Sequence, residues 1–145
     1  MGKLRHVAIA VPDPDASAKF YEQAFGLKRV RESVSAVLLS DGVISLAILN
    51  NKTSHEALGH NGLHHFGFIA NDVDEAAANA EKSGAVYADK AENVAKRFTN
   101  RGQMEDGKVT AEARQQEQRK YVYPNGVKFD IVNSEHARNS WRLPV

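Results

Sequence analysis

Two histidines and one aspartate of this chain have the types and positions that a metal site needs. His6 and His65 occupy equivalent places in two similar segments, and Asp130 stands close to the C-terminus. Side chains of a strand alternate between its two faces. Asp130 therefore points away from its large neighbours Phe129 and Ile131, to the face that we expect the histidines to share. Two neutral imidazoles and a carboxylate suit Fe(II), and also Mn(II), Co(II), Ni(II) or Zn(II). Three protein ligands leave coordination positions open for a substrate and for water or O2.

The two histidines belong to an internal repeat. The segments LRHVAIAVPDPDASAKFYEQAFG and LHHFGFIANDVDEAAANAEKSG align after a shift of 59 residues (65 minus 6), which also superposes Asp13 on Asp72. Each copy reads as a strand, a capped helix and a glycine. The chain is therefore predicted to contain two copies of one module.

The first strand and helix follow from local patterns. Residues 3–11 alternate large residues with small or polar ones, which predicts a strand with one face against a helix and a small face left open for something else. Asp13 is predicted to cap the helix, with Pro14 at its first position and Gly26 at its end. The predicted apolar stripe of this helix is Phe20, Tyr21, Ala24 and Phe25.

The second helix and the remaining strands complete both modules. Asp72 with Glu75 three residues later resembles a capping box, so this helix is predicted to begin there and to run to Gly84. The remaining predicted strands span residues 27–31, 35–39, 43–49, 85–88, 120–123 and 127–132. Each module then has the order β-α-β-β-β.

The predicted fold is an α+β domain in which two βαβββ modules form a curled mixed sheet with a metal-binding cup. One domain spans the whole chain, and its parts are module one (3–49), a polar linker (50–61), module two (62–133) and a tail (134–145). Residues 89–118 form a long charged insertion, expected to be a surface excursion or a lid over the site. The tail carries the only tryptophan, Trp141, and is expected to dock as a short helix or to cover a partner subunit.

Four segments carry a resemblance to a known family. The segments HVAIAV, FYEQAFG, HFGFIAND and YPNGVKFD resemble the vicinal-oxygen-chelate superfamily, which includes glyoxalases, bleomycin-resistance proteins and extradiol dioxygenases. The resemblance implies that metal ligands come from the first and fourth strands of each module, at His6, Ser45, His65 and Asp130. Ser45 stands where glyoxalase I has a glutamate that is both ligand and base, and Asp130 stands where a glutamate is usual. The metal set that remains is His6, His65 and Asp130, a pattern similar to that of extradiol dioxygenases and of thiol-transferring fosfomycin-resistance enzymes.

Three functions follow from this resemblance. The first is a metal-dependent dioxygenase, with Fe(II) favoured, that acts on a small substrate with vicinal oxygens. The second is a lyase or isomerase of the glyoxalase or epimerase kind, in which a group other than Ser45 would move the proton, or a transferase that uses the metal as a Lewis acid. The third is a metal-free small-molecule binding protein of the bleomycin-resistance type.

Several other residues are given lesser roles. Tyr121 and Tyr123 could each hydrogen-bond the substrate near the metal or, as strand tyrosines usually do, pack. Tyr123 is the candidate catalytic residue. His64 is expected to face the helix side of the sheet. Arg97 and Arg101 could bind an anionic substrate if the insertion folds over the cup. Three further histidines are expected at the surface: His55, His60 and His136.

Composition excludes several classes of protein. With 19 Lys and Arg against 18 Asp and Glu, the net charge of +1 gives no electrostatic case for nucleic acid. The chain has no cysteine, which excludes disulfides and thiolate metal sites. The apolar run near the N-terminus is too short for a membrane span, and a cytoplasmic protein is expected. The expected partners are a small-molecule substrate and, by analogy with the family, a second copy of the chain in a homodimer.

Overall fold

The computed structural model describes residues 1–88, 104–105, 108–109, 118–124 and 126–145. Its main feature is one curled eight-stranded sheet with the strand order β2-β3-β4-β1-β5-β10-β9-β6. The helices and strands are β1 (Lys3–Val11), α1 (Pro14–Phe25), β2 (Lys28–Glu32), β3 (Ala36–Ser40), β4 (Ser45–Asn50), β5 (Gly62–Ile69), α2 (Val73–Lys82), β6 (Val86–Tyr87), β7 (Met104–Glu105), β8 (Lys108–Val109), β9 (Arg119–Val122), β10 (Lys128–Val132) and α5 (Ser134–Ser140). Strands β7 and β8 pair in a separate two-stranded sheet.

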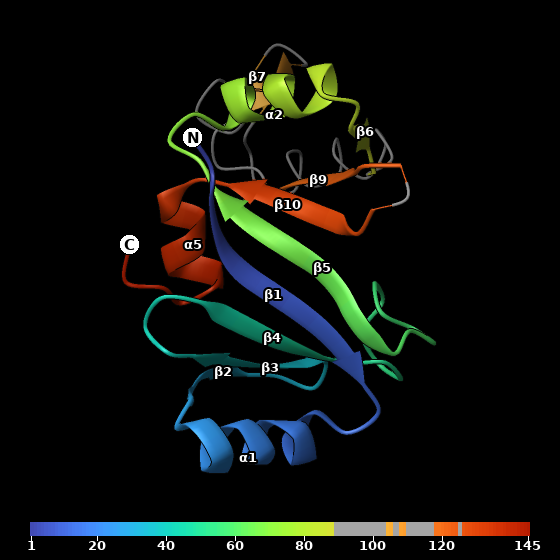
Figure 1. Ribbon diagram of the computed structural model, residues 1–145, viewed down its shortest axis with the longest axis vertical. Helices are drawn as coiled ribbons and strands as arrows, with labels where there is room; N and C mark the ends of the chain where they lie inside the picture. Colours follow the sequence, from blue (N-terminus) through green and yellow to red (C-terminus); the bar gives the residue numbers. More distant parts are fainter. Residues whose placement is uncertain (89–103, 106–107, 110–117, 125) are drawn as a thin grey trace.

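The sheet consists of two equivalent halves. Module one is β1-α1-β2-β3-β4 and module two is β5-α2-β6-β9-β10, and the strand order of one half mirrors that of the other. The modules meet where β1 pairs with β5 in antiparallel fashion, while β1 pairs with β4, and β10 with β5, in parallel. Helices α1 and α2 lie at opposite ends of the molecule, with α5 between them beside the central strands (Figure 1). The predicted fold class, with two βαβββ modules in a curled mixed sheet, is therefore confirmed.

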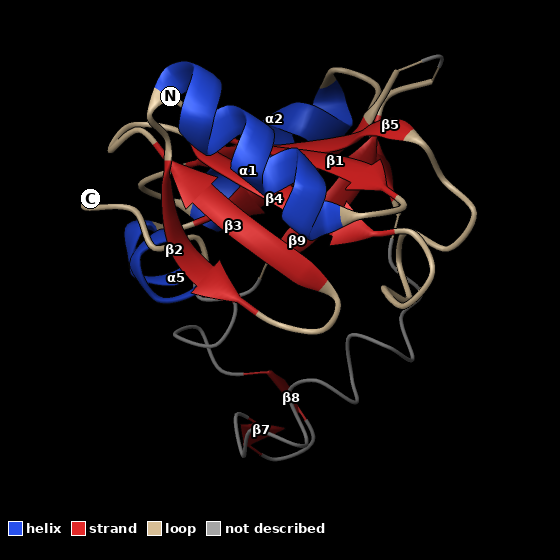
Figure 2. Cartoon of the chain, turned by 90° about the horizontal axis from the view of Figure 1, so that it is seen from below, coloured by secondary structure: helices blue, strands red, loops and turns tan. Residues whose placement is uncertain are grey.

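The alternation in β1 sorts its side chains as predicted. Ile9 and Val11 pack with Ala18 of α1 on the outer face of the sheet, and Figure 2 shows α1 lying across the strands of module one. Ala8 and Ala10 face the other way and are fully buried. This inner face also carries His6.

The helix caps are confirmed, but the predicted stripe of α1 is wrong in part. Asp13 accepts a hydrogen bond from the backbone of Ala16, and Gly26 ends the helix with a positive φ of 71°. Phe20 and Phe25 are 56% and 71% exposed. The sheet-facing positions of α1 are instead Pro14, Ala18 and Tyr21. Their spacing of four and three residues turns the two phenylalanines to the outside.

The tail docks as a short helix, which was one of its two expected roles. Trp141 and Leu143 are 3% and 2% exposed and pack with Ile69 and Val132. These two partners lie on the inner face of β5 and β10, so α5 covers part of that face. Among the described residues, no helix is both long enough and apolar enough to cross a membrane.

Candidate metal centre and substrate pocket

Four adjacent strands, β4, β1, β5 and β10, carry the predicted ligands. His6 pairs with Ser45 on one side and with Gly67 on the other, and Gly67 pairs in turn with Asp130. These residues form one row across the sheet, and His65 lies two residues before Gly67 on the same face. His6, His65 and Asp130 are 3%, 4% and 1% exposed. A single chain therefore brings all three predicted ligands to one buried region.

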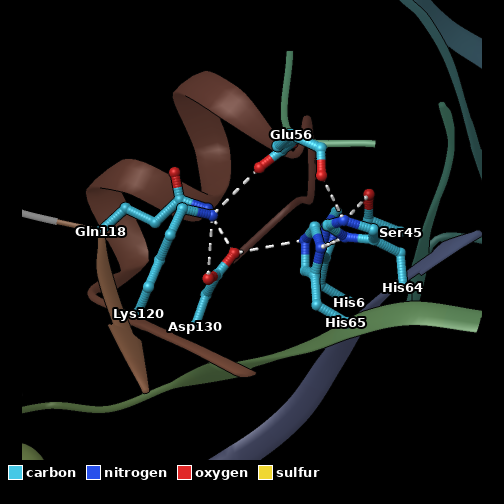
Figure 3. Close-up of polar contacts among 8 residues, drawn as sticks. All are labelled: His6, Ser45, Glu56, His64, His65, Gln118, Lys120 and Asp130. Atoms are coloured by element: carbon cyan, nitrogen blue, oxygen red, sulfur yellow. Dashed lines mark hydrogen bonds and ion pairs between the residues drawn. The ribbon is translucent and has the colours of Figure 1, made fainter. Parts of the chain in front are cut away.

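The predicted ligands contact one another in pairs (Figure 3). Nε2 of His65 lies 3.3 Å from Oδ2 of Asp130. The centroids of the His6 and His65 rings are 5.3 Å apart. Nδ1 of His6 lies 3.2 Å from the hydroxyl of Ser45. Ser45 therefore contacts Nδ1 of His6, and Nε2 is the ring nitrogen of His6 that Ser45 does not contact.

Trp141, the residue that follows α5, covers His6 in this row of side chains. Its ring stacks on His6 with centroids 4.4 Å apart and an interplanar angle of 7°. A Cβ atom at Gly67 would lie 2.5 Å from Cη2 of Trp141 and 2.7 Å from Cβ of His6. The glycine therefore makes room for the tryptophan. His136, expected at the surface, is half-buried with its ring edge-on to Trp141.

His64 lies on the site side of the sheet, and the prediction that it faces the helix side is wrong. Ala8 pairs with His65 and Ile9 pairs with Leu63, so His64 is an extra residue in β5. Such a β-bulge breaks the alternation of side chains and re-aims the residue that it contains. The His64 ring lies 5.0 Å from that of His65, and both line one pocket.

The pocket beside His65 and Asp130 has a volume of about 330 Å³. The linker contributes two of its residues, His55 and Glu56, although it was predicted only as a polar connection. His55 is exposed, as expected, but faces this pocket. Among the described residues, the lining is His55, Glu56, His64, His65, Ala88, Lys120, Lys128 and Asp130.

Lys120 connects the pocket to the predicted metal ligand. Its Nζ atom lies 3.2 Å from Oδ1 of Asp130 and 3.3 Å from Oε2 of Glu56. Burial alone would lower the pKa of Lys120, but Asp130 and Glu56 outweigh it and the pKa is raised, so Lys120 stays charged at neutral pH. The amide of Gln118 donates a hydrogen bond to Oδ2 of Asp130.

Sequence reasoning missed both Lys120 and Glu56. A signal existed for Lys120: in a hairpin centred on Asn125, residues 120 and 130 stand opposite each other, and Lys120 does pair with Asp130. For Glu56 the sequence held no such signal, because its place depends on how the linker folds back over β5 and β9.

Both central histidines are neutral at neutral pH. Burial lowers the pKa of His6 well below its usual value, and electrostatic interactions with His65, Lys120 and His136 lower it further. Burial also lowers the pKa of His65, although Asp130 acts in the opposite direction. Neutral imidazole is the form that ligates metals.

Within the described part of the chain, no group of three or more His, Asp or Glu side chains is arranged to hold a metal ion as it stands. The donor set nevertheless fits a divalent metal in its chemistry, because two neutral imidazoles and a buried carboxylate meet on one face. Lys120 and Gln118 bond the carboxylate of Asp130, so a metal would compete with them for its oxygens.

The other candidates lie away from this region or outside the described residues. Tyr123, the predicted catalytic residue, is 55% exposed and lies beside Gly84, apart from the described residues that line the pocket. Tyr121 packs against residues of α2, which was one of its two expected roles, and donates a hydrogen bond of 2.8 Å to Glu81. Arg97 and Arg101 lie outside the described residues, as does most of the predicted insertion.

Comparison with known families settles the relationship. Residues 3–92 match the model of the Glyoxalase/Bleomycin resistance protein/Dioxygenase superfamily, which is more than half of the chain. The chain belongs to this superfamily. The resemblance inferred from its sequence segments is therefore confirmed.

Solved structures of this superfamily's fold match nearly the whole chain. A hypothetical protein, BH1468, from Bacillus halodurans has 18% identity and a TM-score of 0.59, covering 92% of this chain and 94% of its own. A methylmalonyl-CoA epimerase in complex with methylmalonyl-CoA and NH4+ has 22% identity and a TM-score of 0.56, with coverage of 92% and 95%. The methylmalonyl-CoA epimerase from Mycobacterium tuberculosis has 19% identity and a TM-score of 0.52, with coverage of 90% and 86%. At these identities the matches establish the fold. No curated protein matches the sequence.

Proposed function

We propose that this chain is a metal-dependent enzyme that moves a proton in a small substrate with adjacent oxygen atoms. This is the reaction class of epimerases, isomerases and glyoxalase-type lyases. The observation that carries the proposal is the Glu56–Lys120 ion pair, which lies in one pocket with His65 and Asp130. A carboxylate and an ammonium ion beside a metal ligand set are the groups that proton transfer next to a carbonyl requires.

The proposed metal ligands are His6, His65 and Asp130. A divalent metal held there would act as a Lewis acid that polarises a substrate oxygen. Fe(II), Mn(II), Ni(II), Co(II) and Zn(II) all suit two imidazoles and a carboxylate. The neutrality of both imidazoles and the burial of Asp130 support this assignment.

Glu56 takes the part of the base that Ser45 cannot play. Burial alone would raise the pKa of Glu56, but the charge of Lys120 prevails and the pKa is lowered, so the side chain is ionised at neutral pH. The carboxylate accepts the proton as the substrate C–H bond breaks, and the electron pair moves to the adjacent carbonyl oxygen. The ammonium group of Lys120 stabilises that developing negative charge. Glu56 then loses this proton to solvent, and delivery of a solvent proton to the opposite face of the carbon, with return of the electron pair from the oxygen, gives the epimer.

The dioxygenase remains a second candidate, because the donor set is also that of Fe(II) oxygenases. Among the described residues, Ala88 is the one purely apolar side chain of the eight that line the pocket. Aromatic ligands are usually bound by apolar and aromatic side chains, so this lining suits a small polar acid better than a catechol ring. The pocket chemistry therefore favours proton transfer over ring cleavage.

We also propose that the chain forms a homodimer, as expected by analogy with the family. All three proposed ligands come from one chain, so metal binding should not depend on assembly. Sedimentation of metal-free and metal-loaded protein over a range of concentrations would test whether the chain dimerises and whether dimerisation depends on the metal.

The decisive experiment compares two activities in protein purified without oxygen. Metal content is measured first. Deuterium uptake from D2O into a panel of small 2-hydroxy and 2-oxo acids is then followed by mass spectrometry, and oxygen consumption with catechols is followed with an electrode. We expect metal-dependent deuterium uptake that Glu56→Gln abolishes. Glu75→Gln, an exposed glutamate on α2, is the matched control.

Oxygen consumption with catechols in place of deuterium uptake would replace the proposal with the dioxygenase. Protein that binds no metal even after reconstitution would overturn both catalytic functions. It would leave the metal-free binding protein of the bleomycin-resistance type.

A further inference from the structure

The side chains of two consecutive residues, His64 and His65, are joined through their ring nitrogens. Nδ1 of His64 lies 2.7 Å from Nδ1 of His65. Consecutive side chains of a regular strand point to opposite faces, so this contact exists only because of the bulge at His64. Figure 3 shows both rings beside His6, with a dashed line from His65 to Asp130.

The partners of the His64 ring determine which nitrogens carry hydrogen. Nε2 of His64 lies 2.7 Å from the backbone carbonyl oxygen of Glu56. A carbonyl oxygen only accepts, so Nε2 of His64 donates. In a neutral imidazole the second nitrogen is then an acceptor. Nδ1 of His64 therefore accepts the hydrogen of Nδ1 in His65.

This assignment leaves the lone pair of His65 on Nε2. That nitrogen lies 3.3 Å from Oδ2 of Asp130, which is an acceptor as well. Two acceptors at this distance are stabilised by a cation that both can contact, as ligands of one metal ion do. The tautomer is therefore the one that metal binding at His65 and Asp130 requires.

We infer that His64, anchored on the backbone carbonyl of Glu56, is a positioning residue that holds His65 in the Nδ1–H tautomer and keeps Nε2 of His65 ready for a divalent metal. The tautomer follows from the hydrogen bonds of the two neutral rings, whereas its effect on metal affinity rests on the proposed function. Without His64, neutral His65 can carry its hydrogen on Nε2 and donate it to Asp130. Metal binding would then have to displace that hydrogen bond.

His60 lies beside His64 without a hydrogen bond to its ring among the described contacts. Its ring packs edge-on against His64 with centroids 5.2 Å apart, and its Nε2 lies 2.6 Å from the backbone oxygen of Leu63. His60 does not bond His65 itself among the described contacts. It is therefore a matched control: a histidine that contacts His64 but makes no hydrogen bond that would fix the tautomer of His65.

The first test is spectroscopic and uses the 145-residue chain without metal. Histidines labelled with 15N report their tautomers through two-bond 1H–15N correlations at neutral pH, and His65→Ala identifies the His65 signals. We expect wild-type His65 in the Nδ1–H form. His64→Leu should populate the Nε2–H form. His64→Gln should retain the Nδ1–H form, because its amide can accept from His65 and donate to the Glu56 carbonyl, and His60→Gln should retain it as well.

The second test measures affinity for Zn(II) by competition with a chromophoric chelator. We expect His64→Leu to weaken binding about 10- to 100-fold, and His64→Gln and His60→Gln to stay within a few-fold of wild type. Circular dichroism and thermal denaturation establish that each variant folds.

The outcomes separate this inference from the proposed function. An Nε2–H tautomer in the wild-type protein, or unchanged tautomer and affinity in a folded His64→Leu variant, would overturn the role of His64. The expected tautomers together with no metal binding in any variant would overturn the metal-dependent function and leave the tautomer assignment standing.

Discussion

The ammonium group of Lys120 lies 3.2 Å from Oδ1 of Asp130, so a built-in cation already contacts the carboxylate that is proposed to bind the metal. Both residues are held in place by backbone pairing between β9 and β10, which sets them directly opposite each other. Lys120 therefore has two opposing effects. Its charge suits a substrate oxyanion, and the same charge repels a metal ion.

Replacement of this lysine should strengthen metal binding while it weakens catalysis. Two unit charges roughly 5 Å apart interact by about 3 kcal/mol at an effective dielectric constant of about 20. After partial compensation by solvent, we expect Lys120→Met to raise Zn(II) affinity about 10-fold or more, measured by chelator competition. Lys128→Met is the control, because Lys128 lines the same pocket but is exposed. A decrease in affinity on removal of Lys120 would contradict the proposed placement of the metal.

The close fit of Trp141 over Gly67 makes an alanine at position 67 costly. Its Cβ would lie 2.5 Å from the indole ring and 2.7 Å from Cβ of His6, so both must shift. Overpacking of this kind destabilises proteins by about 1 to 3 kcal/mol. We expect Gly67→Ala to lower the midpoint of urea unfolding accordingly. Gly2→Ala should leave it unchanged, because that Cβ meets Phe68 at an ordinary 3.7 Å; equal midpoints for the two variants would argue against this packing.

Trp141 should also report occupation of the metal site. It is the only tryptophan of the chain and stacks on His6 at 4.4 Å. We expect Co(II) to quench the tryptophan emission of the wild-type protein in a saturable titration. Replacement of the stacked ligand in His6→Gln should abolish the saturable phase. Saturable quenching that persists in this variant would place the ion elsewhere.

The turn before β4 makes the stability of the fold depend on pH, and the direction follows from the pKa of Asp41. The carboxylate of Asp41 accepts hydrogen bonds of 2.7 Å from Ile44 and 2.8 Å from Val43, and these bonds lower the pKa of Asp41 from its usual 3.8. A carboxyl with a lowered pKa in the folded state stabilises the protein above its unfolded pKa, and this stabilisation is lost as pH falls through the folded value. Asp41→Asn should therefore be less stable than wild type at pH 7, with the difference shrinking toward pH 3. Urea unfolding at both pH values measures this, and a difference independent of pH would exclude the linkage.

The sequence by itself determined the modules and the two central histidines. Alternation in residues 3–11 and the cap at Asp13 depend on neighbours within a few positions, and local patterns encode such features directly. The repeat placed His6 and His65 at equivalent positions because each module must bury the same face. All the predicted strands end within two residues of the observed ones. Asp130 followed from the same alternation in the last strand.

Only the tertiary structure decided what surrounds these side chains. The bulge at His64 depends on how β5 pairs with β1, which alternation within one strand does not reveal. Glu56 reaches the pocket because the linker folds back beside β9, and Trp141 reaches His6 because the tail packs over a glycine on another strand. Contacts between residues far apart in the chain depend on strand register and on the curl of the whole sheet, and neither property is encoded in a short stretch of sequence.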